Sequence, residues 1–142
     1  MNNEKDNVYD LVEDFYAHDE GWNTLLRQEY AEGFLRMEAW KGKKNSDLYR
    51  SWDNLTMLCL YLGSAETFLG DMNADDFIDC IAWCGRNISE FTPDYKNTQD
   101  FLETCDGLFK YLKGKNAISN DTVPATAAEI LLQEGKMNII LP

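Results

Sequence analysis

Residues 101–112 read Phe-Leu-Glu-Thr-Cys-Asp-Gly-Leu-Phe-Lys-Tyr-Leu and carry the clearest helical pattern in the chain. Their apolar residues recur at spacings of three and four, which places them on one face of an α-helix. The pattern ends at Lys113–Asn116, where lysines and a glycine are typical of a helix C-terminus. We therefore predict an amphipathic helix here. Its apolar face consists of Phe101, Leu102, Cys105, Leu108, Phe109 and Leu112.

Five further stretches show the same periodicity and predict the remaining helices. They cover about residues 8–17, 22–40, 47–62, 74–88 and 126–135. Turn-forming residues separate them, including Gly42, which can adopt a positive φ, and Pro93, which a helix interior excludes. No repeat or long linker divides the chain. We therefore predict an all-α fold: a single acidic domain, residues 1–142, forming a bundle of about five or six amphipathic helices with a short apolar C-terminal tail.

Particular residues are expected to set the ends of these helices. Ser46 is a suitable N-cap for the third helix, and Gly63 is a suitable stop for it. Asn73 is a suitable N-cap for the fourth. Thr126 and Glu129 have the spacing of a capping box, so we expect the last helix to begin there. The apolar tail after Gly135 is rich in β-branched residues, so the alternatives are packing along the bundle and an isolated strand that seeks a partner; we expect packing.

The composition predicts a folded protein of the cytoplasm. The chain has 142 residues, of which 44% are hydrophobic and 13% aromatic, enough for one core and too many for intrinsic disorder. No apolar run reaches the roughly 18 residues that a bilayer span needs, and Met1–Asp6 shows no signal segment. In such a reducing compartment, disulfides are uncommon and cysteines behave as small core residues.

The charge of the chain is strongly negative. Its 13 Lys and Arg residues against 25 Asp and Glu residues give a formal net charge of −12 at pH 7. A field of this sign repels phosphate backbones and anionic lipid surfaces, which disfavours nucleic acids and membranes as partners. A high net charge also keeps a protein soluble without any partner, so the acidity excludes more functions than it identifies.

The cysteines do not form a convincing metal site. They are Cys59, Cys80, Cys84 and Cys105. Structural zinc sites use closely paired ligands in loops, whereas only Cys80 and Cys84 are close in sequence. Each cysteine also falls on the apolar face of its own helix, as a core thiol would. We expect four free thiols and no bound metal.

The segment Asp71–Asp75 begins like the loop of a helix–loop–helix calcium site, with oxygen ligands at alternate positions. However, Asp76 stands where the loop needs glycine, and Ala82 stands where it needs a bidentate glutamate. We therefore interpret these acidic residues as the N-terminus of a helix, where they favour the positive end of the helix dipole.

The sequence contains no recognisable catalytic or cofactor-binding residues. His18 is the only histidine, and no nucleophile lies in a strained or glycine-rich turn. The glycine patterns of phosphate-binding and dinucleotide-binding loops are absent from the sequence. Neighbouring carboxylates, such as Asp75 and Asp76, lie off the apolar faces, whereas catalytic carboxylates are usually buried. We expect no cofactor, and the sequence favours a protein that is not an enzyme.

The segment Asp47–Ile118 consists of predicted helices ending in Leu108-Phe109-Lys110-Tyr111-Leu112 and a turn. In spacing, this half of the chain is similar to the helical core-binding domain of tyrosine recombinases. The resemblance implies a DNA-associated accessory protein, but the corresponding helices here are acidic, whereas those domains clamp DNA with basic ones. Such a role would require the chain's basic residues to gather on one face. They include Arg27, Arg36, Lys41, Lys43, Lys44 and Arg50.

The leading hypothesis is a non-enzymatic protein-interaction module whose surplus aromatic residues form the contact surface. A sharper form is an inhibitor or nucleic-acid mimic that acts on a basic partner. A homodimer is a further alternative, because bundles with spare apolar surface often dimerise. A third reading is an enzyme with scattered carboxylates in a deep pocket. The interaction candidates, any one of which could instead complete the core, are Tyr16, Trp22, Trp40, Tyr49, Tyr61 and Tyr95.

Overall fold

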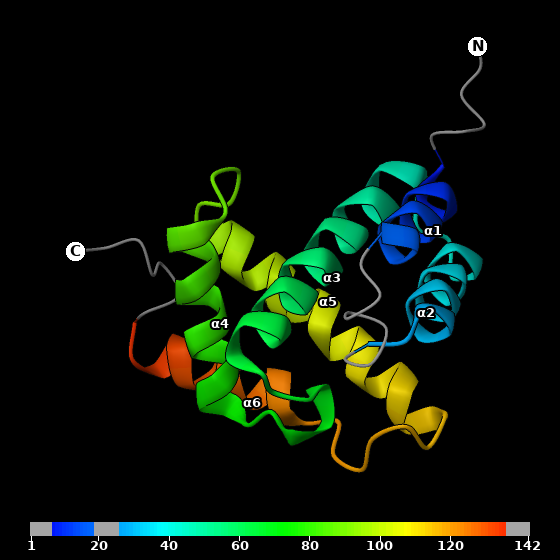
Figure 1. Cartoon of the computed structure of the whole chain (residues 1–142). Helices are drawn as coiled ribbons and strands as arrows, with labels where there is room; N and C mark the ends of the chain where they lie inside the picture. Colours follow the sequence, from blue (N-terminus) through cyan, green and yellow to red (C-terminus); the bar gives the residue numbers. More distant parts are fainter. Residues whose placement is uncertain (1–6, 19–25, 136–142) are drawn as a thin grey trace. The chain divides into compact units, whose positions relative to one another are not determined.

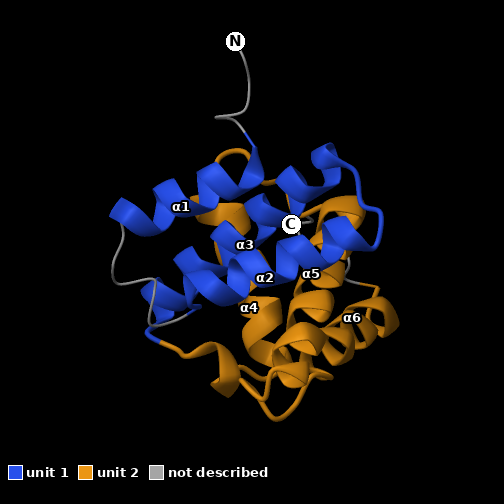
Figure 2. Cartoon of the chain, turned by 90° about the vertical axis from the view of Figure 1, so that its right-hand side faces the viewer, with its two compact units in different colours: residues 1–66 blue, residues 67–142 orange. Residues whose placement is uncertain are grey.

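The computed structural model describes residues 7–18 and 26–135, and the described chain is all-helical, as the sequence predicted. It contains six α-helices and one short 3₁₀ helix in these ranges (Figure 1). The helices fall into two compact units, residues 1–66 and residues 67–142 (Figure 2). We call these unit 1 and unit 2 and describe each by itself. That the whole chain forms a single domain stays a prediction.

Unit 1 is built from three helices that all contact one another: α1 (Val8–His18), α2 (Gln28–Trp40) and α3 (Asn45–Ala65). Helix α3 buries its whole predicted apolar face, because apolar side chains at helical spacing are driven from water together. The predicted faces of α1 and α2 are buried only in part, since Leu11 and Trp40 are exposed. The guanidinium of Arg36 on α2 also lies 4.1 Å from the ring centroid of Tyr9 on α1. The most deeply buried large side chains of this unit are Phe34, Leu35, Leu55, Leu58 and Leu62.

Helix α2 begins later than the sequence predicted. Leu26 and Arg27 are not helical, and Arg27 occupies the N-cap position without a side-chain cap. Leu26 is instead held by a tertiary contact, because its carbonyl accepts a hydrogen bond from the buried hydroxyl of Tyr16. The predicted start at Trp22 lies outside the described residues.

Two expected ends of α3 were wrong. The helix already begins at Asn45, with Lys44 at the N-cap, so Ser46 lies inside the first turn and is not the cap. It also continues past Gly63 to Ala65 and ends at Glu66, which has φ 55° and ψ 42°. The preceding turn behaves as expected, since Gly42 has a φ of 102°.

Unit 2 contains the 3₁₀ helix η3 (Leu69–Asp71) and three α-helices. These are α4 (Ala74–Asn87), α5 (Tyr95–Gly114) and α6 (Val123–Gln133). Helix α6 contacts both α4 and α5. The ring of Phe77 on α4 meets that of Phe109 on α5 edge-on, with centroids 5.4 Å apart. All six apolar residues of the stretch 101–112 are buried, which confirms the prediction from which the fold was inferred.

The ends of the unit 2 helices show which capping signals operate. Asn73 and Asp76 form a capping box on α4, with Asp76 N donating to Asn73 Oδ1 and Asn73 N donating to Asp76 Oδ2, both at 2.9 Å. The predicted capping box of Thr126 and Glu129 was wrong, because α6 already begins at Val123. Inside that helix, the Thr126 hydroxyl donates to the Thr122 carbonyl oxygen at 3.0 Å. Pro124 in the first turn explains the earlier start, since proline suits a helix N-terminus.

None of the helices in the described ranges combines the length and the apolar character that crossing a membrane would require. The C-terminal tail that was predicted to pack along the bundle lies outside the described residues.

Candidate functional site

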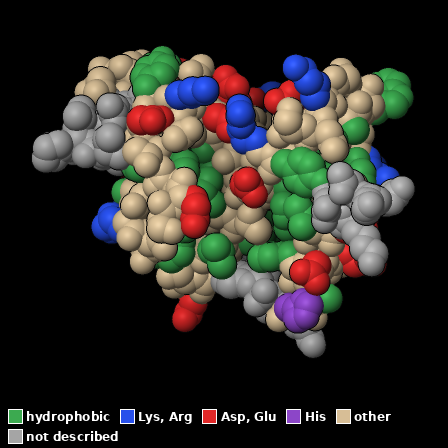
Figure 3. All heavy atoms as spheres, turned by 90° about the horizontal axis from the view of Figure 1, so that it is seen from above, with side chains coloured by type: hydrophobic (Ala, Val, Ile, Leu, Met, Phe, Trp, Pro, Cys, Tyr) green, Lys and Arg blue, Asp and Glu red, His purple; other side chains and the backbone are tan. Residues whose placement is uncertain are grey.

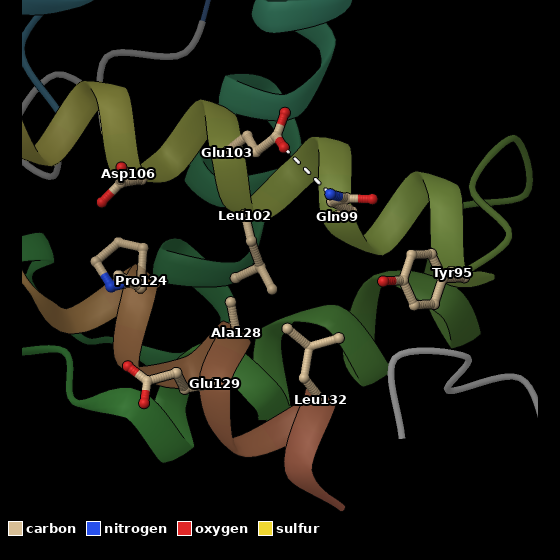
Figure 4. A pocket seen from close by; sticks show the side chains of 10 residues that line it. Tyr95, Gln99, Leu102, Glu103, Asp106, Pro124, Ala128, Glu129 and Leu132 are labelled. Carbon is tan, nitrogen blue, oxygen red and sulfur yellow. Dashed lines mark hydrogen bonds between the residues drawn. The ribbon is translucent and has the colours of Figure 1, made fainter. Parts of the chain in front are cut away.

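A groove of about 380 Å³ lies between α5 and α6 in unit 2 (Figure 4). One wall comes from α5, at positions spaced by three, four or seven residues along one helix face. The other wall comes from the first three turns of α6, where small side chains leave room between the helices. The lining residues are Tyr95, Gln99, Leu102, Glu103 and Asp106 from α5, and Pro124, Ala125, Ala128, Glu129 and Leu132 from α6.

The floor of the groove is apolar. Leu102 extends from α5, and Ala128 and Leu132 extend from α6 toward it (Figure 4). Leu102 is buried, whereas Leu132 keeps 52% of its surface exposed and Tyr95 keeps 51%. Only five large apolar side chains are exposed in the described part of the chain, and these two both line the groove. An apolar contact surface is therefore concentrated here.

Three carboxylates border this floor: Glu103 and Asp106 on α5, and Glu129 on α6. Asp106 Oδ1 lies 2.7 Å from the ammonium of Lys110, and Glu103 Oε2 accepts a weak hydrogen bond from Gln99 at 3.4 Å. Glu129 forms no ion pair with any residue that the structure describes. Because no Lys or Arg lines the groove, its edge carries a net negative charge.

This arrangement is suited to binding and poorly suited to catalysis. Glu103 and Glu129 are exposed and Asp106 is half-buried, so the solvent screens their charges. A general acid or base is usually created by burial, which shifts its pKa toward the working pH. Leu102 points from α5 toward Ala128 of α6 (Figure 4), so apolar side chains lie between the two helices, where an enzyme would place reacting polar groups.

A second hollow near the start of α2 is lined by polar side chains that pair with one another. It is lined by Arg27, Gln28, Glu29 and Glu32. The guanidinium of Arg27 pairs with Glu29 at 2.8 Å, and the Gln28 amide donates to Glu32 Oε2 at 2.8 Å. These side chains therefore already hold one another, and the hollow offers no apolar floor to a ligand.

Two of the aromatic interaction candidates are exposed. Tyr95 lines the α5–α6 groove, and Trp40, the last residue of α2, keeps 87% of its surface exposed. Tyr49 is half-buried on α3. Trp22 lies outside the described residues.

The structure places the other two candidates, Tyr16 and Tyr61, in the interior. Tyr16 packs edge-on against Phe15, with ring centroids 5.3 Å apart, and its hydroxyl donates to the Leu26 carbonyl. Burial, with smaller contributions from Cys59 and Glu32, raises the pKa of Tyr16 above its ordinary value. Both rings are buried and contribute to packing, which leaves little of either for a partner to contact.

All four cysteines are buried free thiols, as the helical pattern predicted. In unit 2, Cys80 lies close enough to Cys84 and Cys105 for both to influence its titration. Burial is the main reason that the pKa of Cys80 is raised, followed by the hydrogen bond with Cys84. Burial also raises the pKa of Cys59 to about 12. A protonated, enclosed thiol is a poor nucleophile.

The remaining sequence candidates lie where a structural role accounts for them. His18 is exposed at the end of α1, and its Nδ1 donates a hydrogen bond to the backbone carbonyl oxygen of Asp14 at 2.9 Å. Asp71 ends η3, and Asp75 and Asp76 form the first turn of α4, as expected for a helix N-terminus. Among the described residues, no group of three or more His, Cys, Asp and Glu side chains is arranged to hold a metal ion.

Three of the six basic residues named for a DNA-associated role are engaged within unit 1. Arg27 pairs with Glu29, Arg36 lies over the Tyr9 ring, and Lys43 pairs with Glu38 at 2.9 Å. On one face of the molecule, charged side chains of both signs lie between apolar ones (Figure 3). These pairings reduce the local positive charge available to a phosphate backbone.

Sequence reasoning identified only Tyr95 among the residues of the groove. It missed Glu103, Asp106 and Leu132, and it assigned Glu129 to a cap. The available signal was the second face of residues 95–106, where Tyr95, Gln99 and Glu103 follow one another at intervals of four. Comparisons with protein-family models, curated proteins and solved structures found no match for this chain.

Proposed function

We propose that this chain is a non-enzymatic protein-interaction module that binds a basic segment of a partner protein through the α5–α6 groove. The observation that carries the proposal is the combination in that groove of an apolar floor, three carboxylates and no cationic residue. A segment with one or two apolar anchors flanked by Lys or Arg is complementary to such a surface.

The two parts of the groove would contribute differently to binding. Leu132 and Tyr95 are half-exposed, and covering them would stabilise a complex by about 25 cal/mol for each Å² of apolar surface removed from water. Tyrosine is also enriched among the residues that dominate interface energies. The carboxylates would set the register of a basic partner and, with the net charge of −12, accelerate its approach.

We also place this activity in the cytoplasm, where the sequence predicted the chain to be. Four buried free thiols support this location, because a reducing compartment keeps cysteines unpaired. In the sharper form of the proposal, the groove occupies a basic surface that the partner uses elsewhere, and the chain then acts as its inhibitor.

The proposal is tested by capturing partners from a lysate of the source cell with the tagged chain, at low and at raised salt. Two groove variants are compared with the wild type: Leu132→Ser removes the exposed anchor, and Glu129→Lys reverses an edge charge. We expect a specific partner that is retained at low salt, weakened by salt, and lost at least tenfold with either variant.

Matched controls separate the groove from general effects of hydrophobicity and charge. Phe68→Ser removes a comparably exposed side chain (58% exposed) elsewhere in unit 2. Glu90→Lys makes the same charge change in the exposed loop before α5. Both controls should retain the partner. A partner that binds all four variants equally would place the binding surface outside the groove and overturn the proposal.

A further inference from the structure

The end of α2 presents the most exposed tryptophan that the structure describes. Trp40 is the last residue of the helix, and it keeps 87% of its surface open, so no described part of its own chain covers it. Fully enclosing an aromatic side chain removes about 150–250 Å² from water, which makes an exposed indole a strong potential anchor. Side chains of this kind are enriched at the centres of protein interfaces.

The backbone that carries Trp40 is held in a defined turn. Lys41 N donates to Met37 O and Gly42 N donates to Ala39 O, both at 3.0 Å, and Lys43 N donates to Glu38 O at 3.1 Å. Gly42 adopts the positive φ of 102° that this turn requires. The indole is therefore presented from an ordered helix end, which lowers the conformational entropy that binding would cost.

The same turn carries lysines that are not used within the described chain. Lys43 pairs with Glu38, but Lys41 and Lys44 form no ion pair with any described residue. The lysines at the end of α5 differ, because each has a neighbour: Lys110 has Asp106, Lys113 has Asp121 at 3.8 Å, and Lys115 lies over the Tyr111 ring. The Trp40–Lys44 turn thus combines an uncovered aromatic anchor with available positive charge.

These features complement those of the α5–α6 groove. The groove offers an apolar floor at Leu102 and Leu132 and a volume of about 380 Å³, enough to receive one large side chain. Glu103 and Glu129 at its edge carry the opposite charge to Lys41 and Lys44. An indole on the floor would place the lysines that follow it near these carboxylates.

We propose that the Trp40–Lys44 turn of one copy of this chain binds in the α5–α6 groove of a second copy. This inference rests on the proposed function, because it makes the Trp40–Lys44 turn of a second copy one of the basic segments that the groove accepts. The turn and the groove are different surfaces, so each contact is heterologous, and copies that use their two surfaces on different neighbours associate head to tail. The net charge of −12 on each copy opposes association, so the contact is weak and forms at high concentration.

The test uses the purified full chain in sedimentation velocity, from about 10 μM to about 1 mM, a range that detects weak association. The wild type should show a sedimentation coefficient that rises continuously with concentration. Trp40→Ser, which lacks the anchor, and Leu132→Ser, which alters the groove, should each remain monomeric. Both side chains are more than half exposed, and circular dichroism checks that the variants are folded.

Mixing the two variants is the decisive step. Trp40→Ser keeps an intact groove and Leu132→Ser keeps an intact turn, so an equimolar mixture should form a 1:1 heterodimer that grows no further. A symmetric interface would not be restored by mixing. Phe68→Ser is the control that should associate like the wild type.

A wild type that stays monomeric at 1 mM, or a mixture that does not form the heterodimer, would overturn this inference. Neither result affects the capture experiment, in which the groove variants are tested against a foreign partner. Conversely, if the two variants associate only when they are mixed, the inference is supported even where the groove variants leave the binding of every captured partner unchanged. The two proposals can therefore fail separately.

Discussion

At the scale of single residues, Glu66 is the one residue other than glycine that has a positive φ in the described part of unit 1. It ends α3 with φ 55° and ψ 42°, and its N–H donates to the Leu62 carbonyl. A left-handed residue at this place is a common way to end a helix, but the residue is usually glycine. For a residue with a Cβ atom, the left-handed conformation costs about 1–2 kcal/mol.

Replacing Glu66 with glycine should therefore stabilise the protein. The relief of strain is partly offset, because glycine gains more backbone freedom on unfolding. We expect the free energy of unfolding of Glu66→Gly to rise by about 0.5–1 kcal/mol, measured by urea denaturation. Glu66→Ala is the control, since it removes the carboxylate but keeps the Cβ atom. Equal stability of the two variants would show that the left-handed backbone is not the cause.

At the scale of the elements, the apolar faces of the helices could be predicted, whereas several of their ends could not. The burial of Phe101, Leu108 and Leu112 could be predicted from their spacing, because many apolar side chains on one face favour the same orientation of the helix. A cap contributes only about 1 kcal/mol, so tertiary contacts override it easily. The bond from Tyr16 to Leu26 accompanies the later start of α2, and α3 runs past Gly63 despite the glycine.

The candidate site was less predictable than the fold, because it depends on how two successive helices pack against each other. Tyr95 was singled out as a surplus aromatic residue, but nothing local to Leu132 indicated which helix it would face. Within the groove, the small residue Ala128 of α6 faces Leu102 of α5 (Figure 4). The packing of α5 against α6 decides which side chains face each other, and the periodicity of either helix alone does not predict this packing.

The packing of α4 against the loop before α5 reverses a usual rule about glycine in helices. Gly85 lies within α4, where alanine is normally more stable by about 1 kcal/mol. A Cβ atom at this position, however, would lie only 2.7 Å from Cγ of the buried Pro93 ring. We expect Gly85→Ala to lower the free energy of unfolding by about 1–3 kcal/mol, as overpacking does.

Gly114, at the end of α5, is the matched control for this prediction. A Cβ atom there would meet no other atom within 4 Å, so only the intrinsic helix preference should act. Gly114→Ala should therefore leave the stability unchanged or raise it by up to about 1 kcal/mol. Both variants are measured by thermal and urea unfolding. A stabilising Gly85→Ala would mean that the Pro93 loop moves away at little cost.

At the scale of the whole molecule, the buried titratable groups link stability to pH on the alkaline side. Free thiols are enclosed in both units, with Cys59 in α3 and Cys80 in α4. Burial raises the pKa of Cys59 from 9.0 to about 12 and raises that of Cys80 as well. In the unfolded chain, these thiols regain their ordinary pKa values. The folded state therefore holds their protons at a pH where the unfolded state has released them.

The direction of the effect follows from this difference. Below about pH 8.5, thiols are protonated in both states, and their full contribution to stability is present. As the pH rises from 9 toward 12, the unfolded state releases its protons first and is favoured. Each such thiol should then lower the free energy of unfolding by up to about 1.4 kcal/mol per pH unit. Urea unfolding at pH 8, 9, 10 and 11 measures this slope.

Cys59→Ala separates the effect of this thiol from that of Tyr16, whose pKa is also raised by burial. The substitution leaves a small cavity and lowers the stability at every pH, so the slopes of the two proteins are compared, not their absolute values. Between pH 9 and 11, the wild type should lose stability more steeply than Cys59→Ala by up to about 1.4 kcal/mol per pH unit. Identical slopes would mean that the Cys59 thiol becomes hydrated before the protein unfolds, and that α3 opens locally at alkaline pH.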